Sequence, residues 1–360
     1  MKMRFLNTAY FSPRYLGLAI RQELKFAGVR GLVNLAHNFI SMNMRPEEIA
    51  SRFTVLQIEP TINCNLSCDI CDHEKNIPGA ALDFSGFKLI VDQFPSLRQV
   101  NLTGRGESFL NGDIYRMIRY AKGKNIYTRI TTNAVLLDED KCREIIASGL
   151  DELRISVDSA DPEKYRKIKG NADIGIVEKN ISCLNALRNG RHPVLEFNTV
   201  VFRQNIHDLR QIIFMAHRLN VGAVFASGLV LKNASLAVKD NLLTAMETGE
   251  IERVYSEAMS LAKKLGIYLR LPNFIETRTK CSMPWLYCYI TYDGYVFPCC
   301  MAACMPQRLD ETEKYSMGNI LKDPWSKIKN SPKFRGFRKT IKEGKPHPLC
   351  AGCSILNGTF

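Results

Sequence analysis

The amino-acid sequence predicts an α/β fold with a parallel sheet, followed by a small cysteine-rich module. The first observation is that apolar, β-branched stretches alternate with helical stretches from residue 53 to residue 230, which is typical of strand–helix–strand units. The second is that seven of the 12 cysteines fall between residues 281 and 353. Six such units can form either a doubly wound sheet or a curved, partly closed barrel.

The expected strands are apolar or alternating stretches bounded by turn residues. They lie at 53–60, 98–104, 126–134, 152–158, 194–202 and 221–230, and helices are expected near 83–94, 112–123, 138–148 and 206–219, with further helical segments between 158 and 189. The composition changes after about residue 270, where a short segment needs a metal to hold its shape. We therefore divide the chain into an N-terminal helical segment (1–50), an α/β domain (51–270) and a cysteine-rich module (271–360).

The N-terminal segment predicts a basic amphipathic helix over residues 14–40. Its apolar residues recur roughly at helical spacing, and the basic residues between them are Arg14, Arg21, Lys25 and Arg30. Such a helix either packs on the surface of the domain, with its charges in water, or lies on an anionic membrane. We favour packing on the domain, because surface helices of this kind are common.

The overall composition restricts the class of protein. Apolar residues make up 46% of the 360 residues, yet the chain has no 18-residue apolar span and no pattern of a signal peptide. We therefore expect a cytoplasmic protein, with peripheral membrane contact as an alternative. Twelve cysteines in a reducing compartment indicate metal or redox chemistry rather than disulfides. The net charge of +13 favours an anionic partner, such as a phosphorylated substrate, nucleic acid, an acidic protein or a membrane.

Three cysteines directly follow the first predicted strand. Cys64, Cys68 and Cys71 have the spacing C-x3-C-x2-C. A structural zinc site needs four ligands, for which His73 is a candidate. A [4Fe–4S] cluster on three cysteines keeps one iron open, where a small molecule can bind and be reduced. The iron–sulfur interpretation explains the number of cysteines without a fourth ligand.

This loop resembles that of the radical S-adenosylmethionine (SAM) enzymes. The resemblance implies a partial (β/α)6 TIM-like barrel whose open iron binds SAM. It also implies reductive cleavage of SAM to a 5′-deoxyadenosyl radical, which abstracts a hydrogen atom from the substrate. Flavodoxin or ferredoxin is the kind of reductant that such an enzyme uses.

The same resemblance implies SAM contacts at the ends of the following strands. The sequence GRGES (104–108) occupies the place of the family's GGE-type motif, although Arg105 interrupts the glycines and Ser108 replaces a frequent proline. The implied contacts are Gly104, Gly106 and Glu107 for the amino group, with Asn133, Ser156, Asp158 and Asn198 at later strand ends. Ser, Asn and Asp also cap loops in many proteins, so a purely structural role is the alternative. No general base or acid is evident.

The cysteine-rich module resembles the SPASM/twitch modules of radical SAM enzymes. Cys281, twelve residues, Gly294, four residues and Cys299 match their first motif, and Cys350 and Cys353 follow as C-x2-C. Four such thiolates can close around zinc or complete a [4Fe–4S] cluster. The chain contains no further cysteines after this pair, so we expect a twitch-type module with one auxiliary [4Fe–4S] cluster. Spare or alternative ligands are Cys288, Cys300 and Cys304.

The resemblance predicts a radical SAM oxidoreductase. We favour a small-molecule, sugar or lipid substrate, with net oxidation, dehydrogenation or rearrangement. The alternative is a maturase that modifies a peptide or protein side chain. It is less favoured because the first fifty residues are too short and too helical for the usual winged-helix domain that binds a leader peptide. A minor alternative is a non-enzymatic metal scaffold that binds nucleic acid through its positive charge, but we expect no nucleic-acid partner because a scaffold has no use for an open metal position.

Overall fold

The computed structural model describes residues 13–71, 76–170, 172–190, 192–229, 246–273, 281–304, 310–350 and 353. His73, the candidate fourth zinc ligand, lies outside these residues. Among the helices described, none is both long and apolar enough to cross a membrane.

One curved sheet of nine strands runs through the described part of the chain. Its order is β7-β6-β5-β4-β3-β2-β1-β8-β9, and its neighbours are parallel except for the antiparallel pair β8–β9. The strands are β1 (Val55–Ile58), β2 (Gln99–Leu102), β3 (Tyr127–Thr132), β4 (Glu152–Ser156), β5 (Val194–Val201), β6 (Ala223–Gly228), β7 (Tyr268–Arg270), β8 (Tyr287–Ile290) and β9 (Val296–Phe297). The predicted partial barrel of six strand–helix units is confirmed.

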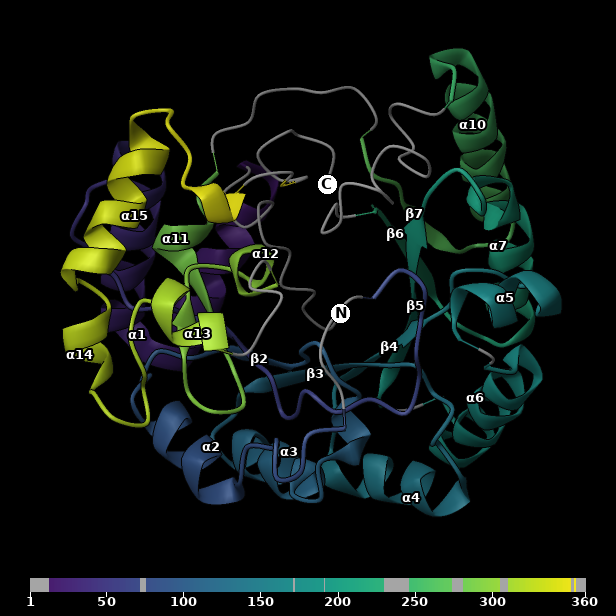
Figure 1. Ribbon diagram of the computed structural model, residues 1–360, viewed down its shortest axis with the longest axis horizontal. Helices are drawn as coiled ribbons and strands as arrows, with labels where there is room; N and C mark the ends of the chain where they lie inside the picture. The colour runs from purple at the N-terminus through teal and green to yellow at the C-terminus, as the bar shows by residue number, and fades with distance from the viewer. Residues whose placement is uncertain are drawn as a thin grey trace.

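Helices cover the outer side of this sheet and leave its inner side uncovered by helices (Figure 1). The outer helices are α2 (Phe84–Asp92), α3 (Ile114–Gly123), α4 (Glu139–Ser148), α5 (Pro162–Ile168), α6 (Ile174–Arg188), α7 (Leu209–Arg218) and α10 (Thr248–Lys264), with 3-10 turns η2 (Ser108–Leu110) and η3 (Ile206–Asp208). Their apolar faces pack on the buried residues of the strands, as in α3. Aspartates begin several of them, because a carboxylate accepts the otherwise unpaired N–H groups of a first turn: Asp138 accepts from Lys141 N at 2.8 Å.

The C-terminal module continues the barrel sheet rather than standing apart from it. β8 lies parallel to β1, with Ile58 opposite Ile290, and a hairpin turn joins it to the antiparallel strand β9. Gly294 in this turn has φ +88°, a conformation that favours glycine. The remaining helices of the module are α11 (Met283–Leu286), α12 (Cys300–Ala303), α13 (Asp310–Tyr315), α14 (Trp325–Ile328) and α15 (Pro332–Lys342), with the 3-10 turn η4 (Pro348–Cys350).

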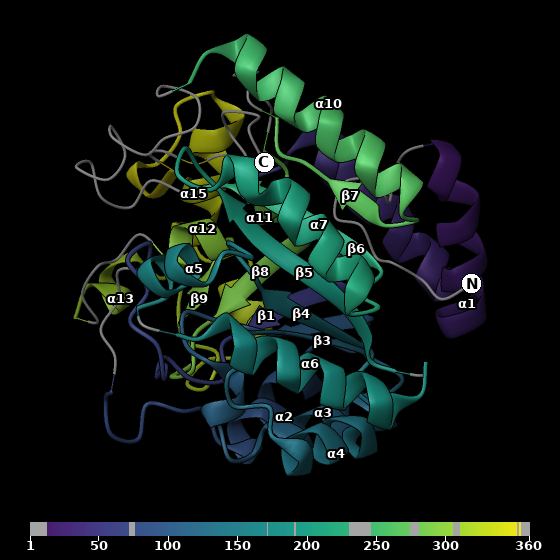
Figure 2. The same cartoon turned by 90° about the vertical axis from the view of Figure 1, so that its right-hand side faces the viewer.

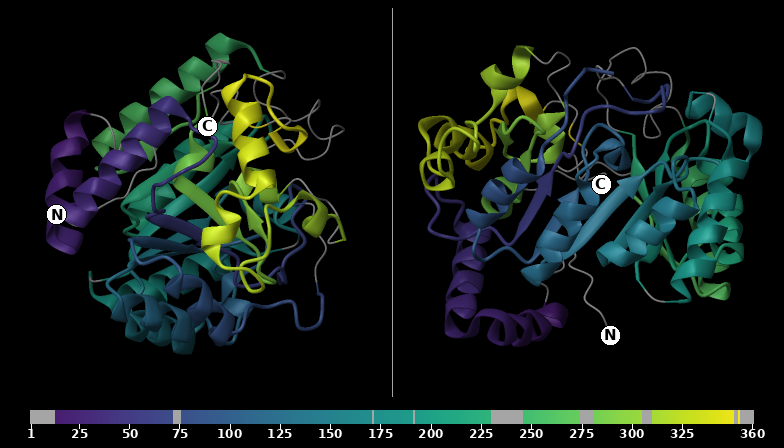
Figure 3. Two further views of the ribbon diagram at one scale, coloured as in Figure 1. Left: turned by 90° about the vertical axis from the view of Figure 1, so that its left-hand side faces the viewer. Right: turned by 90° about the horizontal axis from the view of Figure 1, so that it is seen from below.

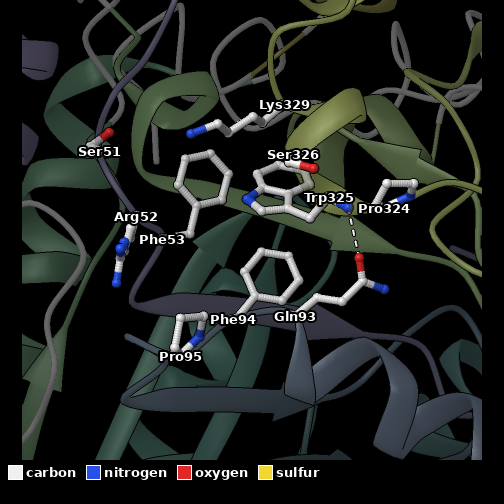
Figure 4. Close-up of a pocket in the computed structure, with 10 residues that line it drawn as sticks. All are labelled: Ser51, Arg52, Phe53, Gln93, Phe94, Pro95, Pro324, Trp325, Ser326 and Lys329. Atoms are coloured by element: carbon white, nitrogen blue, oxygen red, sulfur yellow. Dashed lines mark hydrogen bonds between the residues drawn. The ribbon is translucent and has the colours of Figure 1, made fainter.

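An aromatic cluster fastens this module to the start of the barrel. The Trp325 ring lies 5.1 Å from the ring of Phe53 and 5.0 Å from that of Phe94, and Trp325 N donates to Gln93 Oε1 at 2.7 Å (Figure 4). A pocket of about 330 Å³ lies among these residues, and Lys329 is also part of its lining. These residues come just before β1, just before β2 and from α14, so the pocket lies at the amino ends of the strands.

The N-terminal segment forms helix α1 (Pro13–Met44), which is kinked at Gly28. The second half of α1 is held at the same amino ends, because Asn34 exchanges two hydrogen bonds with the backbone of Arg52, of 3.0 and 2.7 Å. Trp285 Nε1, just before β8, donates to Pro46 O at 2.7 Å. Figure 2 accordingly shows α1 on the opposite side of the sheet from α12 and α13, and the left view of Figure 3 agrees. The predicted helix and its packing on the domain are both present.

Candidate functional site

The inner face of the sheet is polar. Here the inner face means the strand side chains that point away from the outer helices: Gln57, Asn101, Arg129, Thr131, Glu152, Arg154, Ser156, Glu196, Asn198 and Tyr289. Side chains of a strand alternate between its two faces, and the intervening residues form the apolar core. A buried polar face of this extent requires hydrogen-bonding partners.

Charged side chains of β3, β4 and β5 form one group on this inner face. Arg129 Nη2 donates to Glu152 Oε2 at 2.9 Å, and Arg154 Nε donates to Glu152 Oε1 at 2.9 Å. Arg154 also lies 3.2 Å from Glu196 Oε2. Although burial alone would raise the pKa of Glu152, the two guanidiniums lower it below its ordinary value. The paired charges are thereby kept ionised inside the barrel.

The three-cysteine loop leaves β1 at the carboxyl ends of the strands. Cys64, Cys68 and Cys71 are half-buried and carry free thiols, and Cys71 N donates to Cys68 O at 3.1 Å. The loop is supported from α5, since Asp69 N donates to Ile168 O at 3.0 Å. Gly170 packs against the loop so closely that an added Cβ would lie 2.1 Å from Ser67 O.

A buried ion pair links the start of this loop to the C-terminal module. Glu59, fully buried, accepts hydrogen bonds from Arg105 N at 2.8 Å, Nε at 3.0 Å and Nη2 at 2.9 Å. Tyr289 of β8 donates its hydroxyl to the same carboxylate at 2.8 Å. Burial opposes ionisation of both groups, but the pairing lowers the pKa of Glu59 and raises that of Arg105. Arg105, which departs from the family's usual glycines, therefore has a defined partner.

Gly104 and Gly106 of the GRGES motif leave no room for a side chain. A Cβ on Gly104 would lie 2.2 Å from Glu59 Cγ, and one on Gly106 would lie 2.4 Å from Asn63 O. Glu107 is buried, and its carboxylate accepts from Thr132 Oγ1 at 2.9 Å and from Asn133 N at 2.8 Å. The motif therefore ties the end of β2 to the cysteine loop and to the end of β3.

The other predicted SAM contacts fall into two groups. Ser156 and Asn198 are register partners on β4 and β5, and both are half-buried on the inner face. Asn133 instead donates its side-chain amide to Asn65 Oδ1, within the cysteine loop, at 2.8 Å. The carboxylate of Asp158 accepts a hydrogen bond from Val200 N at 2.7 Å and forms an ion pair with Lys169 Nζ at 2.5 Å. A ligand would have to displace these groups to reach the Asp158 side chain.

Lys169 is the main residue near the site that sequence reasoning missed. It is buried next to Cys68, and although burial opposes its charge, Asp158 and the Cys68 thiol raise its pKa. Its neighbour Gly170 has φ +61°. The only sequence signal was the lysine–glycine pair that ends α5, a very common combination at the end of a helix.

The four cysteines predicted for the auxiliary cluster are free thiols of the C-terminal module. Cys353 N donates to Cys350 O at 3.1 Å. Burial raises the pKa of Cys281 to about 11 and that of Cys350 to about 12, and in both cases the Cys353 thiol adds to the shift. Burial also raises the pKa of Cys299 well above its ordinary value, with contributions from Cys281 and Cys353. Among the described residues, no three cysteine, histidine, aspartate or glutamate side chains are arranged as a metal site, so this set of four thiols, a donor set that zinc or an iron–sulfur cluster uses, stays a prediction.

The three unassigned cysteines of the module differ in their surroundings. Cys288 is fully buried in β8, where burial raises the pKa of its thiol. Cys300 lies beside Tyr287 and Cys353, and Cys304 lies near Arg105.

Comparison with known proteins identifies both regions. Residues 58–216 match the Radical SAM superfamily, and residues 281–354 match SPASM, an iron–sulfur cluster-binding domain. The chain therefore carries a radical SAM domain and an SPASM domain. These two domains imply a [4Fe–4S] cluster that binds SAM together with auxiliary iron–sulfur chemistry, as predicted. Free thiols are the donors that such groups use, and both places carry them. The chain is thus a radical SAM enzyme.

Several curated proteins resemble this radical SAM enzyme along most of their length. The AdoMet-dependent heme synthase of Nitratidesulfovibrio vulgaris is 26% identical over 82% of this chain and 85% of its own. The PqqA peptide cyclase of Gluconobacter oxydans is 27% identical over 83% of this chain and 82% of its own.

Solved structures show the same fold at lower sequence identity. Streptococcus suis SuiB, bound to its precursor peptide SuiA, has a TM-score of 0.66 at 14% identity, covering 92% of this chain and 76% of its own. The enzyme anSMEcpe with bound AdoMet has a TM-score of 0.60 at 14% identity, covering 83% and 88% of the two chains.

Proposed function

We propose that each cysteine set holds one [4Fe–4S] cluster: the SAM-binding cluster on Cys64, Cys68 and Cys71, and one auxiliary cluster on Cys281, Cys299, Cys350 and Cys353. The first set lies on a single loop at the carboxyl ends of the strands, where barrel enzymes place their chemistry. In the second set, the Cys353 thiol adds to the raised pKa of each of the other three cysteines. When bound, these groups supply the electron that cleaves SAM and the means to abstract a hydrogen atom.

We further propose that the substrate is a peptide or protein side chain, rather than the small molecule, sugar or lipid that the sequence favoured. The observation that carries this proposal is the match to PqqA peptide cyclases, which extends over both the barrel and the module. The polar inner face supports it, because its amide, hydroxyl and charged side chains can hydrogen-bond a peptide but would be poorly matched to a lipid chain. Ser156 and Asn198 would contact what enters the barrel from the carboxyl ends.

We propose net oxidation as the reaction class. Loss of a hydrogen atom from a substrate C–H bond, followed by loss of one further electron and one proton, gives a product two electrons more oxidised. The electron would leave toward the auxiliary cysteines. On β8, Tyr287 lies beside Cys300, and Tyr289, on the inner face, lies near Cys304. The proton would pass to water or to a carboxylate of the substrate.

The substrate class can be tested with an extract of the source cells. Reconstituted enzyme is incubated with SAM, dithionite and a low-molecular-weight extract, and 5′-deoxyadenosine is measured. A matched portion of the extract is first treated with proteinase K, which is then inactivated. We expect the extract to stimulate cleavage of SAM and the protease to abolish that stimulation. Stimulation that survives the protease would overturn the peptide proposal and favour a small molecule.

The cluster assignment is tested separately by cysteine substitution. Replacing Cys64, Cys68 and Cys71 with alanine should remove about four irons per chain and abolish SAM cleavage. Replacing Cys350 and Cys353 should remove the auxiliary iron but leave cleavage of SAM without substrate. SAM cleavage by the triple variant would refute the first assignment. Intact auxiliary iron in the double variant would assign that cluster to Cys288, Cys300 or Cys304 instead.

A further inference from the structure

The second half of α1 turns several polar residues toward the domain. Asn34, Asn38 and Ser41 are each at most 7% exposed, beside the equally buried Leu35. Asn34 exchanges hydrogen bonds with the backbone of Arg52, and Ser41 donates its hydroxyl to Ser51 at 3.5 Å. A surface helix of a globular protein normally buries its apolar stripe and exposes its polar one, so this arrangement needs a reason.

The outward side of this half-helix carries an apolar stripe. Val29, Val33, Ile40 and Met44 are 73%, 50%, 46% and 71% exposed. Their spacing of four, seven and four residues places them along one side of a helix, with a period near 3.6 residues. An exposed apolar stripe of this kind usually marks a surface that contacts a membrane or another protein.

One exposed basic residue, Arg30, lies next to the stripe. The sequence of α1 before the kink adds Arg14, Arg21 and Lys25 against the single acidic residue Glu23. A basic helix with an exposed apolar stripe is typical of helices that lie in the surface of an anionic bilayer.

Two further cations lie at the same end of the sheet. Arg52 follows the segment bound to α1, and Lys329 stands beside it in the aromatic pocket (Figure 4). Within the described part of the chain neither is ion-paired to a carboxylate. Burial and the neighbouring guanidiniums of Arg52 and Arg338 lower the pKa of Lys329. An anionic surface would relieve this repulsion.

We propose that the second half of α1 docks this enzyme on an anionic phospholipid bilayer, with the apolar stripe inserted at the surface. The amino ends of the strands then face the lipid, because α1 and the aromatic pocket both lie there. The cysteine loop lies at the opposite, carboxyl ends of the strands, on the other side of the sheet from α1 (Figure 2). Docking would therefore keep the enzyme at the membrane while its substrate arrives from the aqueous side.

The test is sedimentation of the reconstituted full-length enzyme with vesicles. Wild type should sediment with vesicles of phosphatidylglycerol and phosphatidylcholine, and bind pure phosphatidylcholine more weakly. The double variant Ile40→Ser/Met44→Ser should bind the anionic vesicles at least tenfold more weakly, because it removes two inserted side chains. Its matched control is Leu89→Ser/Phe214→Ser, which changes two similarly exposed side chains on α2 and α7 and should bind as wild type.

The contribution of charge is tested with Arg52→Gln/Lys329→Gln. This variant should lose about tenfold in affinity for anionic vesicles, and salt near 1 M should remove the same difference. Its control is Lys88→Gln/Lys179→Gln, two exposed lysines on the outer helices. All four variants should retain iron and substrate-free SAM cleavage, because none touches the cysteine loop.

Equal vesicle binding by wild type and the Ile40/Met44 variant would overturn the proposal, as would the absence of vesicle binding by wild type. A wild-type dimer that this variant converts to monomer, measured by light scattering in the absence of vesicle binding, would show that the stripe contacts a second copy instead. None of these outcomes depends on the identity of the substrate.

Discussion

Replacement of Gly170 by alanine should damage the first cluster without touching a cysteine. The added Cβ would lie 2.1 Å from Ser67 O, whereas ordinary contact begins at 3.4 Å, so the carbonyl would have to retreat by about 1.3 Å. Ser67 is bonded directly to Cys68. Metal–ligand distances tolerate only about 0.2 Å, so a shift of this size should break the attachment of the cluster. We expect loss of about four irons per chain and of SAM cleavage.

The natural control is Gly190→Ala. Gly190 has φ +70° and Gly170 has φ +61°, so both substitutions force alanine into the left-handed region, at a cost of about 1 kcal/mol. Around Gly190, however, no atom lies within 4 Å of the new Cβ. Iron and SAM cleavage should therefore be normal in Gly190→Ala, as measured by iron analysis and 5′-deoxyadenosine formation. Normal iron in Gly170→Ala would refute the argument that this contact positions the loop.

Three further predictions concern the ends of β1 and β2. Glu59→Gln should lower the free energy of unfolding by about 3–5 kcal/mol, because it leaves the Arg105 guanidinium buried without a counter-charge. Tyr289→Phe removes only one hydrogen bond and should lower the free energy of unfolding by about 1.5 kcal/mol. Equal losses of unfolding free energy for the two variants in urea titrations would contradict this account. The pKa of Glu59 is lowered in the folded state, so the stabilisation by its charge is complete above its ordinary pKa of about 4.5 and is lost as the pH falls through the folded pKa. The difference in unfolding free energy between wild type and Glu59→Gln should therefore narrow below pH 4.5. A difference that widened there would show that the pKa of Glu59 is raised in the folded state instead. Gly106→Ala should lose iron, because its Cβ would collide with the backbone just before Cys64. Gly112→Ala should keep its iron, because no atom lies within 4 Å of its Cβ. Retention of iron by both variants would show that the cysteine loop can move aside.

The sequence alone located the chemistry because its signals are local. Cys64, Cys68 and Cys71 fall within eight consecutive residues, so their spacing is visible without any fold. The six strand–helix units were equally visible, because an alternating or apolar strand and an amphipathic helix each repeat within a few residues. The short strand β7 (Tyr268–Arg270) was missed, since three residues are too few to show a period.

The substrate class proposed from the comparisons differs from the one that the sequence favoured. The preference for a small molecule came from the first fifty residues, which say little about the barrel interior. The polar inner face is spread over β1 to β5 and β8, and its members are separated by up to about 230 residues. Each appears in the sequence as one polar residue within a strand, which by itself is also compatible with a solvent-exposed position.

What the sequence determined about this protein is thus the set of local patterns: two cysteine motifs, a row of parallel strands and a basic N-terminal helix. The tertiary structure decided which distant residues meet. It brought Tyr289 to Glu59 across 230 residues and Gly170 to Ser67 across about a hundred. It also decided that α1 turns Asn34 inward and Ile40 outward. A helix specifies which residues share a face, but only the surface it packs against, here the backbone of Arg52, selects which face is buried.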